Sequence, residues 1–207
     1  MPTAVLTDPE ADGRNLRRRH SYDAAVDAVL DLIGEGVPAP TAQQIADRSG
    51  ISIRTVFRLT DDVESLHAAA VQRQTERIAP LYVALPTEGV VKARIASLVS
   101  NRATIFETIA PVRRVAERLA LDSTRIADGL ARHHRLLRAQ VAALFEAELA
   151  QLTKERRVDA LNAVDVAASW ETWDQLRRRQ SLSRREATRV VTQLLSGVLG
   201  PTGTRRP

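Results

Sequence analysis

Residues Thr41–Leu59 read TAQQIADRSGISIRTVFRL, two short amphipathic segments separated by a tight turn. Thr41 and Gln44 have the spacing of a capping box, which predicts that a short helix begins there. Gly50 can take the left-handed backbone conformation that the turn after this helix requires. A second short helix is then expected over Ser52–Leu59, with its first residue as the N-cap.

Apolar residues at fixed offsets hold such a helix pair together. Ala46 is small enough to let the second helix cross closely, and four further residues supply the contacts between the helices: Ile45, Ile51, Val56 and Leu59. This set of offsets is the helix-turn-helix pattern, in which the second helix enters the major groove of DNA. We therefore predict a DNA-binding unit with Ser52–Leu59 as its recognition helix.

The residues before this motif predict a tail, a basic arm and a first helix. Residues 1–13 are expected to form a disordered tail, followed by a basic arm that contains Arg14, Arg17, Arg18 and Arg19. Ser21 is a plausible N-cap for a helix that runs to about Glu35. Acidic residues recur every four positions on one face of that helix: Asp23, Asp27, Asp31 and Glu35. Because they would repel phosphates, we expect this face to point away from DNA.

The remainder of the chain has helical periodicity throughout and almost no strand signal, so the fold class is predicted to be all-α. We expect a DNA-binding domain over residues 21–66, a helical regulatory and dimerisation domain over 67–200, and a tail over 201–207. Pro111 and the Ser181–Ser183 break punctuate the pattern. The helices expected after the motif cover about 60–78, 88–109, 111–119, 123–150, 154–180 and 183–199.

Composition and charge narrow the class of protein. The chain of 207 residues contains no Cys, which excludes disulfides, thiolate metal sites and cysteine catalysis. No apolar run is long enough to span a membrane, and the N-terminal residues lack the order of a signal peptide, so a cytoplasmic protein is expected. The net charge is +5, and nearly every cation is Arg, a residue that suits phosphate recognition. The alternative explanation for the excess of Arg over Lys is codon bias.

The segment Tyr22–Leu66 resembles the DNA-binding domain of the TetR (tetracycline repressor) family. Its matching run is TAQQIADRSGISIRTVFRLTDDVESL, residues 41–66, and the segment from Ala168-Ser169-Trp170 to Leu182-Ser183 resembles the last two helices of the family. The resemblance implies a homodimer that reads an inverted-repeat operator on double-stranded DNA. It also implies a small-molecule effector bound in the C-terminal domain, with repression as the usual mode.

Carried over residue by residue, the resemblance implies two kinds of DNA contact. Thr41 and Ser52 would bind phosphates through hydroxyl groups and helix N-termini. Bases or nearby sugars and phosphates would be reached by Arg54, Thr55, Phe57 and Arg58. The chain departs from the family pattern at Phe57, where the family commonly has Tyr, and at Thr60 and Val63. We expect the arm Arg17–Arg19 to compensate along the backbone or in the minor groove, the alternative being a flexible solubilising arm.

Two polar residues interrupt apolar stripes in the C-terminal region. Arg102 and His134 are each flanked by inward-facing aliphatic residues, and buried polar groups need partners. One interpretation directs both into a ligand cavity, with Phe106 and Trp170 as weaker lining candidates. The alternative is an internal ion pair, for instance with Asp165, or snorkelling to the surface.

The last helices are apolar on more than one side, which predicts a dimer interface in a four-helix bundle. The residues assigned to it are Trp173, Val190, Val191, Leu194, Leu195 and Val198. The alternative for the same surface is intrachain core. No metal or cofactor is predicted, since the adjacent His133 and His134 would point about 100° apart on a helix.

Two other classes of function were weighed against a DNA-binding regulator. A helical interaction protein without DNA binding would share the helical pattern. A small enzyme would need catalytic signatures, and the sequence contains no phosphate-binding Gly-rich loop, no serine nucleophile elbow and no HExxH motif. The helix-turn-helix offsets favour the regulator.

Overall fold

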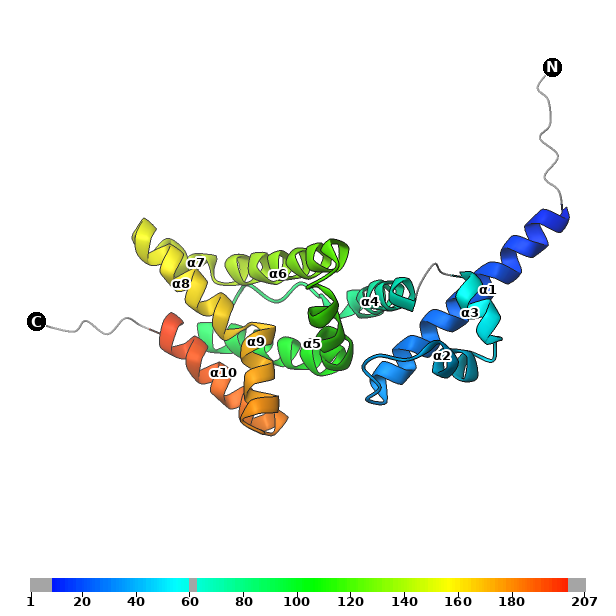
Figure 1. Cartoon of the computed structure of the whole chain (residues 1–207). Helices are drawn as coiled ribbons and strands as arrows, with labels where there is room; N and C mark the ends of the chain where they lie inside the picture. Colours follow the sequence, from blue (N-terminus) through cyan, green and yellow to red (C-terminus); the bar gives the residue numbers. More distant parts are fainter. Residues whose placement is uncertain (1–8, 60–62, 201–207) are drawn as a thin grey trace, which may run out of the picture. The chain divides into compact units, whose positions relative to one another are not determined.

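The computed structural model describes residues 9–59 and 63–200, and within these ranges every regular element is a helix (Figure 1). This confirms the predicted all-α class. The first four helices are α1 (Pro9–Gly34), α2 (Ala42–Ser49), α3 (Ile53–Leu59) and α4 (Val63–Ile78), followed by the 3-10 turn η1 (Ala79–Leu81). The rest are α5 (Val91–Leu119), α6 (Thr124–Leu144), α7 (Glu146–Ala150), α8 (Lys154–Ala167), α9 (Trp170–Asp174), the π-helical turn η2 (Gln175–Arg179) and α10 (Arg184–Leu199).

The chain forms two compact units. The first contains the residues up to Arg77 together with Pro111–Ile126, and the second contains Ile78–Ala110 and the residues from Ala127 onward. A DNA-binding domain was expected over residues 21–66; the first unit also includes α4 up to Arg77 and α5 from Pro111. The expectations for residues 1–8, for the start of the fourth helix at 60–62 and for the tail 201–207 lie outside the described residues.

The first unit is built on the apolar stripe of α1. Helices α2 and α3 both pack against α1 and against each other (Figure 1). The core residues of α1 are almost fully buried and lie at helical spacing: Ala25, Val26, Val29, Leu30 and Ile33. Ile45 from α2 and Val56 from α3 join them in one cluster. The apolar offsets predicted for the helix-turn-helix therefore form the core of this unit.

The acidic face of α1 is occupied by arginines of the neighbouring helices. Asp27 accepts hydrogen bonds from Arg73 at 3.2 Å and from Arg77 at 2.6 Å, and Asp23 also pairs with Arg73. Since these partners lie on α4, the acidic stripe ties α4 to α1. The predicted stripe exists, and its charge is balanced inside the unit.

Helix α1 begins twelve residues earlier than the sequence predicted, at Pro9 instead of Ser21. The expectation of a tail and arm over residues 1–20 is therefore wrong for residues 9–20, which are helical. Pro at the first helical position has its φ angle already set for a helix and lacks only an N–H that would have no partner there. Ser21 looked like an N-cap, but no breaker between Arg14 and Ser21 interrupts the helix that passes through it.

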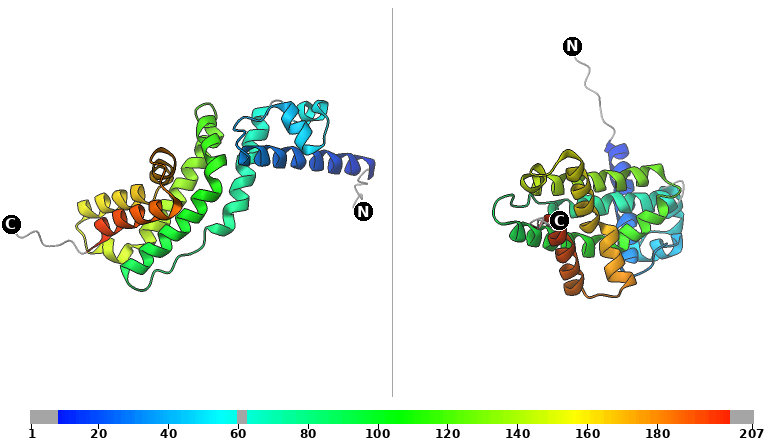
Figure 2. Two further views of the ribbon diagram at one scale, coloured as in Figure 1. Left: turned by 90° about the horizontal axis from the view of Figure 1, so that it is seen from below. Right: turned by 90° about the vertical axis from the view of Figure 1, so that its left-hand side faces the viewer.

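In the second unit α8 and α10 lie side by side (Figure 2). Three aromatic rings form the centre of its core: Phe106 packs edge-on against Trp170 at 5.9 Å between centroids and at a tilt against Trp173 at 6.4 Å. Glu107 accepts hydrogen bonds from the Trp173 indole and from Arg177, and the Arg177 bond holds the pKa of Glu107 below its ordinary value. The ion pair between Glu107 and Arg177 thus holds the edge of the aromatic core through the Trp173 indole.

The predicted helix over 123–150 is interrupted at Phe145, where the backbone leaves helical geometry. The buried Arg94 on α5 explains the break. Its guanidinium donates to the carbonyl oxygen of Leu144 at 2.6 Å and pairs with Glu148 on α7. Because the Leu144 carbonyl accepts from this side chain, the backbone hydrogen bonding of α6 ends there, and α7 starts two residues later, at Glu146.

Two further helix boundaries differ from the sequence expectation. Pro111 was expected to end a helix, but α5 passes through it, because buried residues on both sides (Ile109 and Val112) anchor the helix against the loss of one backbone hydrogen bond. The single helix expected over 154–180 is broken after Ala167. There the Ser169 hydroxyl accepts a hydrogen bond from the backbone N–H of Thr172 at 3.1 Å and caps α9.

The turn at Gly50 generates a stability prediction. Gly50 has φ +71°, its N–H donates to the Ala46 carbonyl at 3.0 Å, and no atom lies within 4 Å of the position a Cβ would take. Gly50→Ala therefore introduces backbone strain without a clash, and we expect it to lower the free energy of unfolding by about 1–2 kcal/mol. Chemical denaturation measures this.

The matched control is Gly34→Ala, because Gly34 ends α1 with a negative φ and equally open space around it. Alanine is the better helix former, so this variant should be neutral or stabilised by less than about 1 kcal/mol. Equal losses in the two variants would show that the turn at Gly50 carries no special conformational demand.

Candidate nucleic-acid interface

Helix α3 has one buried face and one exposed face. Val56 and Leu59 are buried and anchor it to the first unit. On the other side Arg54, Phe57 and Arg58 are exposed, and the Phe57 ring keeps 61% of its surface accessible. A large exposed aromatic flanked by two arginines is an unfavourable arrangement for a surface that meets only water, and it fits a surface that meets bases and phosphates.

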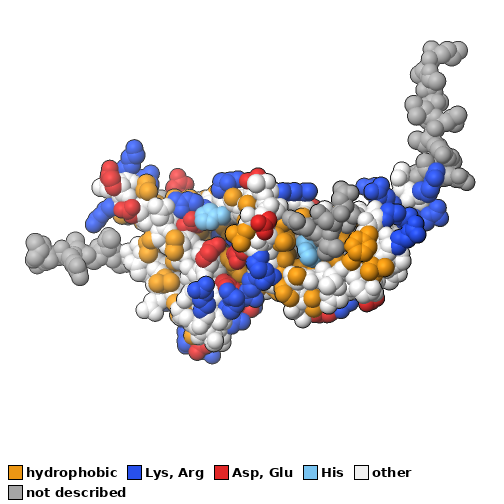
Figure 3. Space-filling view, in the orientation of Figure 1, with side chains coloured by type: hydrophobic (Ala, Val, Ile, Leu, Met, Phe, Trp, Pro, Cys, Tyr) orange, Lys and Arg blue, Asp and Glu red, His pale blue; other side chains and the backbone are white. Residues whose placement is uncertain are grey.

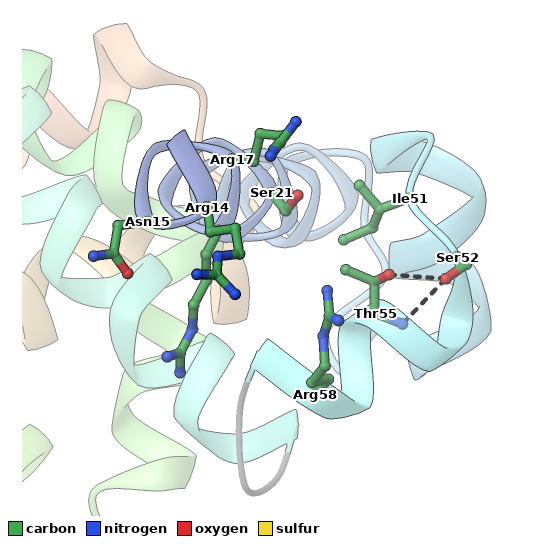
Figure 4. Close-up of a pocket in the computed structure, with 9 residues that line it drawn as sticks. Arg14, Asn15, Arg17, Ser21, Ile51, Ser52, Thr55 and Arg58 are labelled. Carbon is green, nitrogen blue, oxygen red and sulfur yellow. Dashed lines mark hydrogen bonds between the residues drawn. The ribbon is translucent and has the colours of Figure 1, made fainter. Parts of the chain in front are cut away.

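A groove separates the exposed side of α3 from the N-terminal half of α1. Its cavity measures about 750 Å³. Figure 4 shows Arg58 extending from α3 toward α1, with Arg14 on the opposite wall. Nine residues line it: Arg14, Asn15, Arg17, Arg18, Ser21, Ile51, Ser52, Thr55 and Arg58. Among these nine described residues four are arginines and none is acidic, so the described lining of the groove is cationic and open to solvent.

The hydroxyl groups predicted to bind phosphate already serve as helix caps. The Thr41 hydroxyl accepts from the Gln44 N–H at 3.3 Å and donates to the Gln44 side chain at 3.1 Å, which confirms the capping box. The Ser52 hydroxyl accepts from the Thr55 N–H at 3.2 Å and shares a 2.8 Å hydrogen bond with the Thr55 hydroxyl. Thr41 and Ser52 are exposed and Thr55 is half-buried, and the first role of these hydroxyl groups is to hold α2 and α3 in place.

The structure brings together part of the predicted DNA-binding set and adds to it. Arg17, Arg18, Ser52, Thr55 and Arg58 share the groove, whereas Arg19, Arg54, Phe57 and Thr41 do not line it. Sequence reasoning missed Arg14, Asn15 and Ser21 as groove residues. The signal was present, since positions 14, 17, 18 and 21 share one face of a helix, but it requires α1 to be helical before Ser21.

Ion pairing explains why the cations gather at this end of the unit. Arg48 binds Glu35 with two hydrogen bonds, and this carboxylate raises the pKa of Arg48 above its ordinary value. The pair with Asp23 likewise raises the pKa of Arg73. Asp23, Asp27 and Glu35 thus bind arginines that do not line the groove. Figure 3 shows basic side chains gathered over the N-terminal part of α1.

The predicted ligand residues occupy different surroundings in the second unit. Phe106 and Trp170 are buried in the aromatic core. The His134 ring is half exposed and lies 3.2 Å from an Asp165 oxygen. Of the two interpretations given for His134, the structure therefore matches the pair with Asp165. Arg138 also binds Asp165, at 2.7 Å. Arg102 is buried, with 2% of its surface exposed, and forms no such pair.

The residues assigned to a dimer interface divide into two groups. Trp173, Val191 and Leu195 are buried within the chain, which matches the alternative of intrachain core for these three. On α10 the half-buried Val190 and Val198 pack against the edge of the core, and Leu194, which is 45% exposed, faces outward. The neighbouring helix α8 exposes Val158 and Val166, at 52% and 64%. An apolar surface thus remains uncovered on both helices.

Comparison with known proteins identifies the fold. No protein-family model matches the chain, and no curated protein matches it. Among solved structures, the chain is similar to a TetR-family transcriptional regulator from Streptomyces coelicolor, with a TM-score of 0.61 and 20% sequence identity. The superposition covers 87% of this chain and 80% of the other.

The chain therefore has the fold of the TetR-family transcriptional regulators, as the resemblance of residues 22–66 implied. The likeness extends over both compact units, although the sequence motif covers only the first. Within the described residues, no helix is long and apolar enough to cross a membrane.

Proposed function

We propose that the protein is a sequence-specific DNA-binding transcriptional regulator. The observation that carries the proposal is the exposed face of α3, with Arg54, Phe57 and Arg58, beside a groove whose described lining holds four arginines and no acid. The fold it shares with a TetR-family regulator supports the same function. Double-stranded DNA is the partner that needs both an exposed helix for base edges and cations for its backbone.

The two surfaces have separate tasks in this proposal. Arg54 lies in the first turn of α3, where side chains reach base edges in the major groove, and an arginine fork binds guanine with two hydrogen bonds. Phe57, one turn on, contacts a thymine methyl or a sugar. The groove arginines neutralise phosphates, which adds affinity without reading sequence.

The second unit is proposed to dimerise and to respond to a small molecule. The uncovered apolar residues on α8 and α10 support a homodimer that forms through these helices. Two reading heads related by a two-fold axis require an inverted-repeat operator. Repression relieved by an effector is the mode that the family resemblance implies.

Selection of bound sites from random DNA tests the proposed function. We expect an enriched inverted repeat with half-sites about one helical turn apart, and binding that weakens steeply with salt. Failure to bind any duplex at low salt would favour the alternative of a helical interaction protein without DNA binding.

Arg54→Ala tests base reading. Loss of a bidentate contact should weaken binding to the selected site by about 1–3 kcal/mol and relax specificity at one position of each half-site. Competition titrations against the selected site and against random duplex measure both effects. If affinity for random duplex falls by the same factor, Arg54 binds phosphate and does not read a base.

Arg17→Ala and Arg58→Ala test the groove. Each removes one phosphate contact, so the slope of log affinity against log salt should fall by about 1 in each variant. The ranking of DNA sequences should be preserved in Arg17→Ala. Arg125→Ala is the matched control, because Arg125 is an exposed arginine of the same unit outside the groove. A salt slope unchanged in all three variants would show that the groove does not bind the DNA backbone.

Leu194→Glu tests the dimer surface. A charge on the exposed face of α10 should shift the sedimentation equilibrium toward monomer, because it would have to be desolvated in the interface. The control is Leu121→Glu, since Leu121 is 84% exposed and lies on neither α8 nor α10. Unaltered association of Leu194→Glu would place the interface elsewhere.

A further inference from the structure

The second unit contains a buried positive charge without a counter-charge. Of the two buried arginines in the described part of the chain, Arg94 pairs with Glu148. Arg102 has no carboxylate within ion-pair distance among the described residues; its guanidinium donates only to neutral acceptors, the Gln140 side chain at 2.8 Å and the Leu137 carbonyl at 3.1 Å. An arginine taken out of water without an anion is strongly unfavourable.

Three further observations describe this group as unsatisfied. The Arg102 Nε atom is buried and has no hydrogen-bond partner. Burial lowers the pKa of Arg102 to about 10, the opposite direction from the carboxylate-paired Arg177. Tyr82 and Asp165 both favour its charged form, but the carboxylate of Asp165 already binds Arg138 and His134. No carboxylate of the described chain therefore compensates the positive charge of Arg102.

Gln140 links the guanidinium to the non-helical loop of residues 82–90, which we call the cover loop. The Gln140 amide accepts from Arg102 with its oxygen and donates with its nitrogen to the Val83 carbonyl at 2.9 Å. Two more hydrogen bonds hold the start of this segment: Asn101 to the Leu81 carbonyl at 2.9 Å, and Tyr82 with His133 at 2.8 Å. The cover loop is thus attached by a few side-chain contacts, and one of them uses the partner of Arg102.

A shallow hollow of mixed polarity lies beside the cover loop. It measures about 540 Å³ and is bounded by residues 83–86 of the loop and by residues of α5 from Ala96 to Thr104. Asn101 lines it and has a buried side-chain oxygen without a partner. Its loop wall is aliphatic, its α5 wall carries Ser97, Ser100, Asn101 and Thr104, and Arg102 does not line it. The buried residues on the Arg102 side of α5 are apolar, among them Leu98, Ile105 and Phe106, so a molecule that reaches the guanidinium needs an apolar body.

We propose that Arg102 binds the carboxylate of an amphipathic monoanion, which replaces Gln140 as the partner of the guanidinium and thereby releases the cover loop. The charge count favours a monoanion, since one buried cation is neutralised by one negative charge, whereas a phosphate dianion leaves an excess charge in the interior. The planar carboxylate also matches the fork of an arginine. This inference names the effector class of the ligand response and therefore rests on the proposed function.

Thermal unfolding of the intact protein tests the site without reference to DNA. The probes are benzoate and hexanoate at millimolar concentration, with benzamide and hexanamide as neutral analogues of the same shape and with ionic strength held constant. We expect at least one carboxylate to raise the melting temperature by about 3 °C or more, and neither amide to do so. No carboxylate-specific rise in the wild type overturns the proposal.

Two variants separate an anion site from a structural arginine. Arg102→Met should abolish the carboxylate response and unfold at the same temperature as the wild type or higher, because the unpaired charge is gone. Gln140→Glu should also lose the response while raising the melting temperature, because it supplies a carboxylate at the position of the amide. If Arg102→Met does not fold, Gln140→Glu decides, and a retained response in either folded variant overturns the proposal.

Arg135→Met is the matched control, since Arg135 is exposed on α6 in the same unit, and it should keep the full carboxylate response. Loss of the response in this control would show that the carboxylates act through surface charge and would overturn the site. DNA binding is measured separately with the same probes. A melting response without DNA release supports the anion site and contradicts the ligand control in the proposed function.

Discussion

A helix of seven residues is too short to persist alone in water, and α3 is such a helix. Its position depends on the burial of Val56 and Leu59 against the apolar stripe of α1. That one contact decides which residues of α3 remain outside. Because Arg54, Phe57 and Arg58 lie on the opposite side of a short rigid element, the same packing that stabilises the first unit presents the surface proposed to read DNA.

Local signals in the sequence were sufficient for the helix-turn-helix and insufficient for the helix breaks. The cap at Thr41 and the turn at Gly50 depend on neighbours within a few residues, so they could be predicted. The end of α6 depends on Arg94, fifty residues away, and no periodicity in α6 contains that information. The start of α1 was missed for a different reason, since Ser21 satisfies the pattern of an N-cap and also tolerates the interior of a helix.

The charge on each surface depends more on which residues form ion pairs than on how many charged residues the chain has. The first unit holds about as many acids as arginines, yet Asp23, Asp27 and Glu35 bind Arg48, Arg73 and Arg77, whereas the described lining of the groove holds four arginines. In the second unit Glu148, Asp165 and Glu107 each pair with an arginine, and the buried Arg102 has no such pair among the described residues. Net charge alone predicted neither the cationic groove nor the unpaired Arg102, because the fold determines which charged side chains form ion pairs.

The continuity of α1 through residues 14–21 has a thermodynamic consequence for the groove. A disordered basic arm would lose backbone freedom on binding, at a cost of about 1–2 kcal/mol for each residue that becomes ordered. Here that entropy is lost during folding, and the helix fixes the spacing of its arginines at about 1.5 Å of axial rise per residue. The cations of α1 are therefore preorganised, and their contribution to affinity depends on the integrity of the helix as well as on their charge.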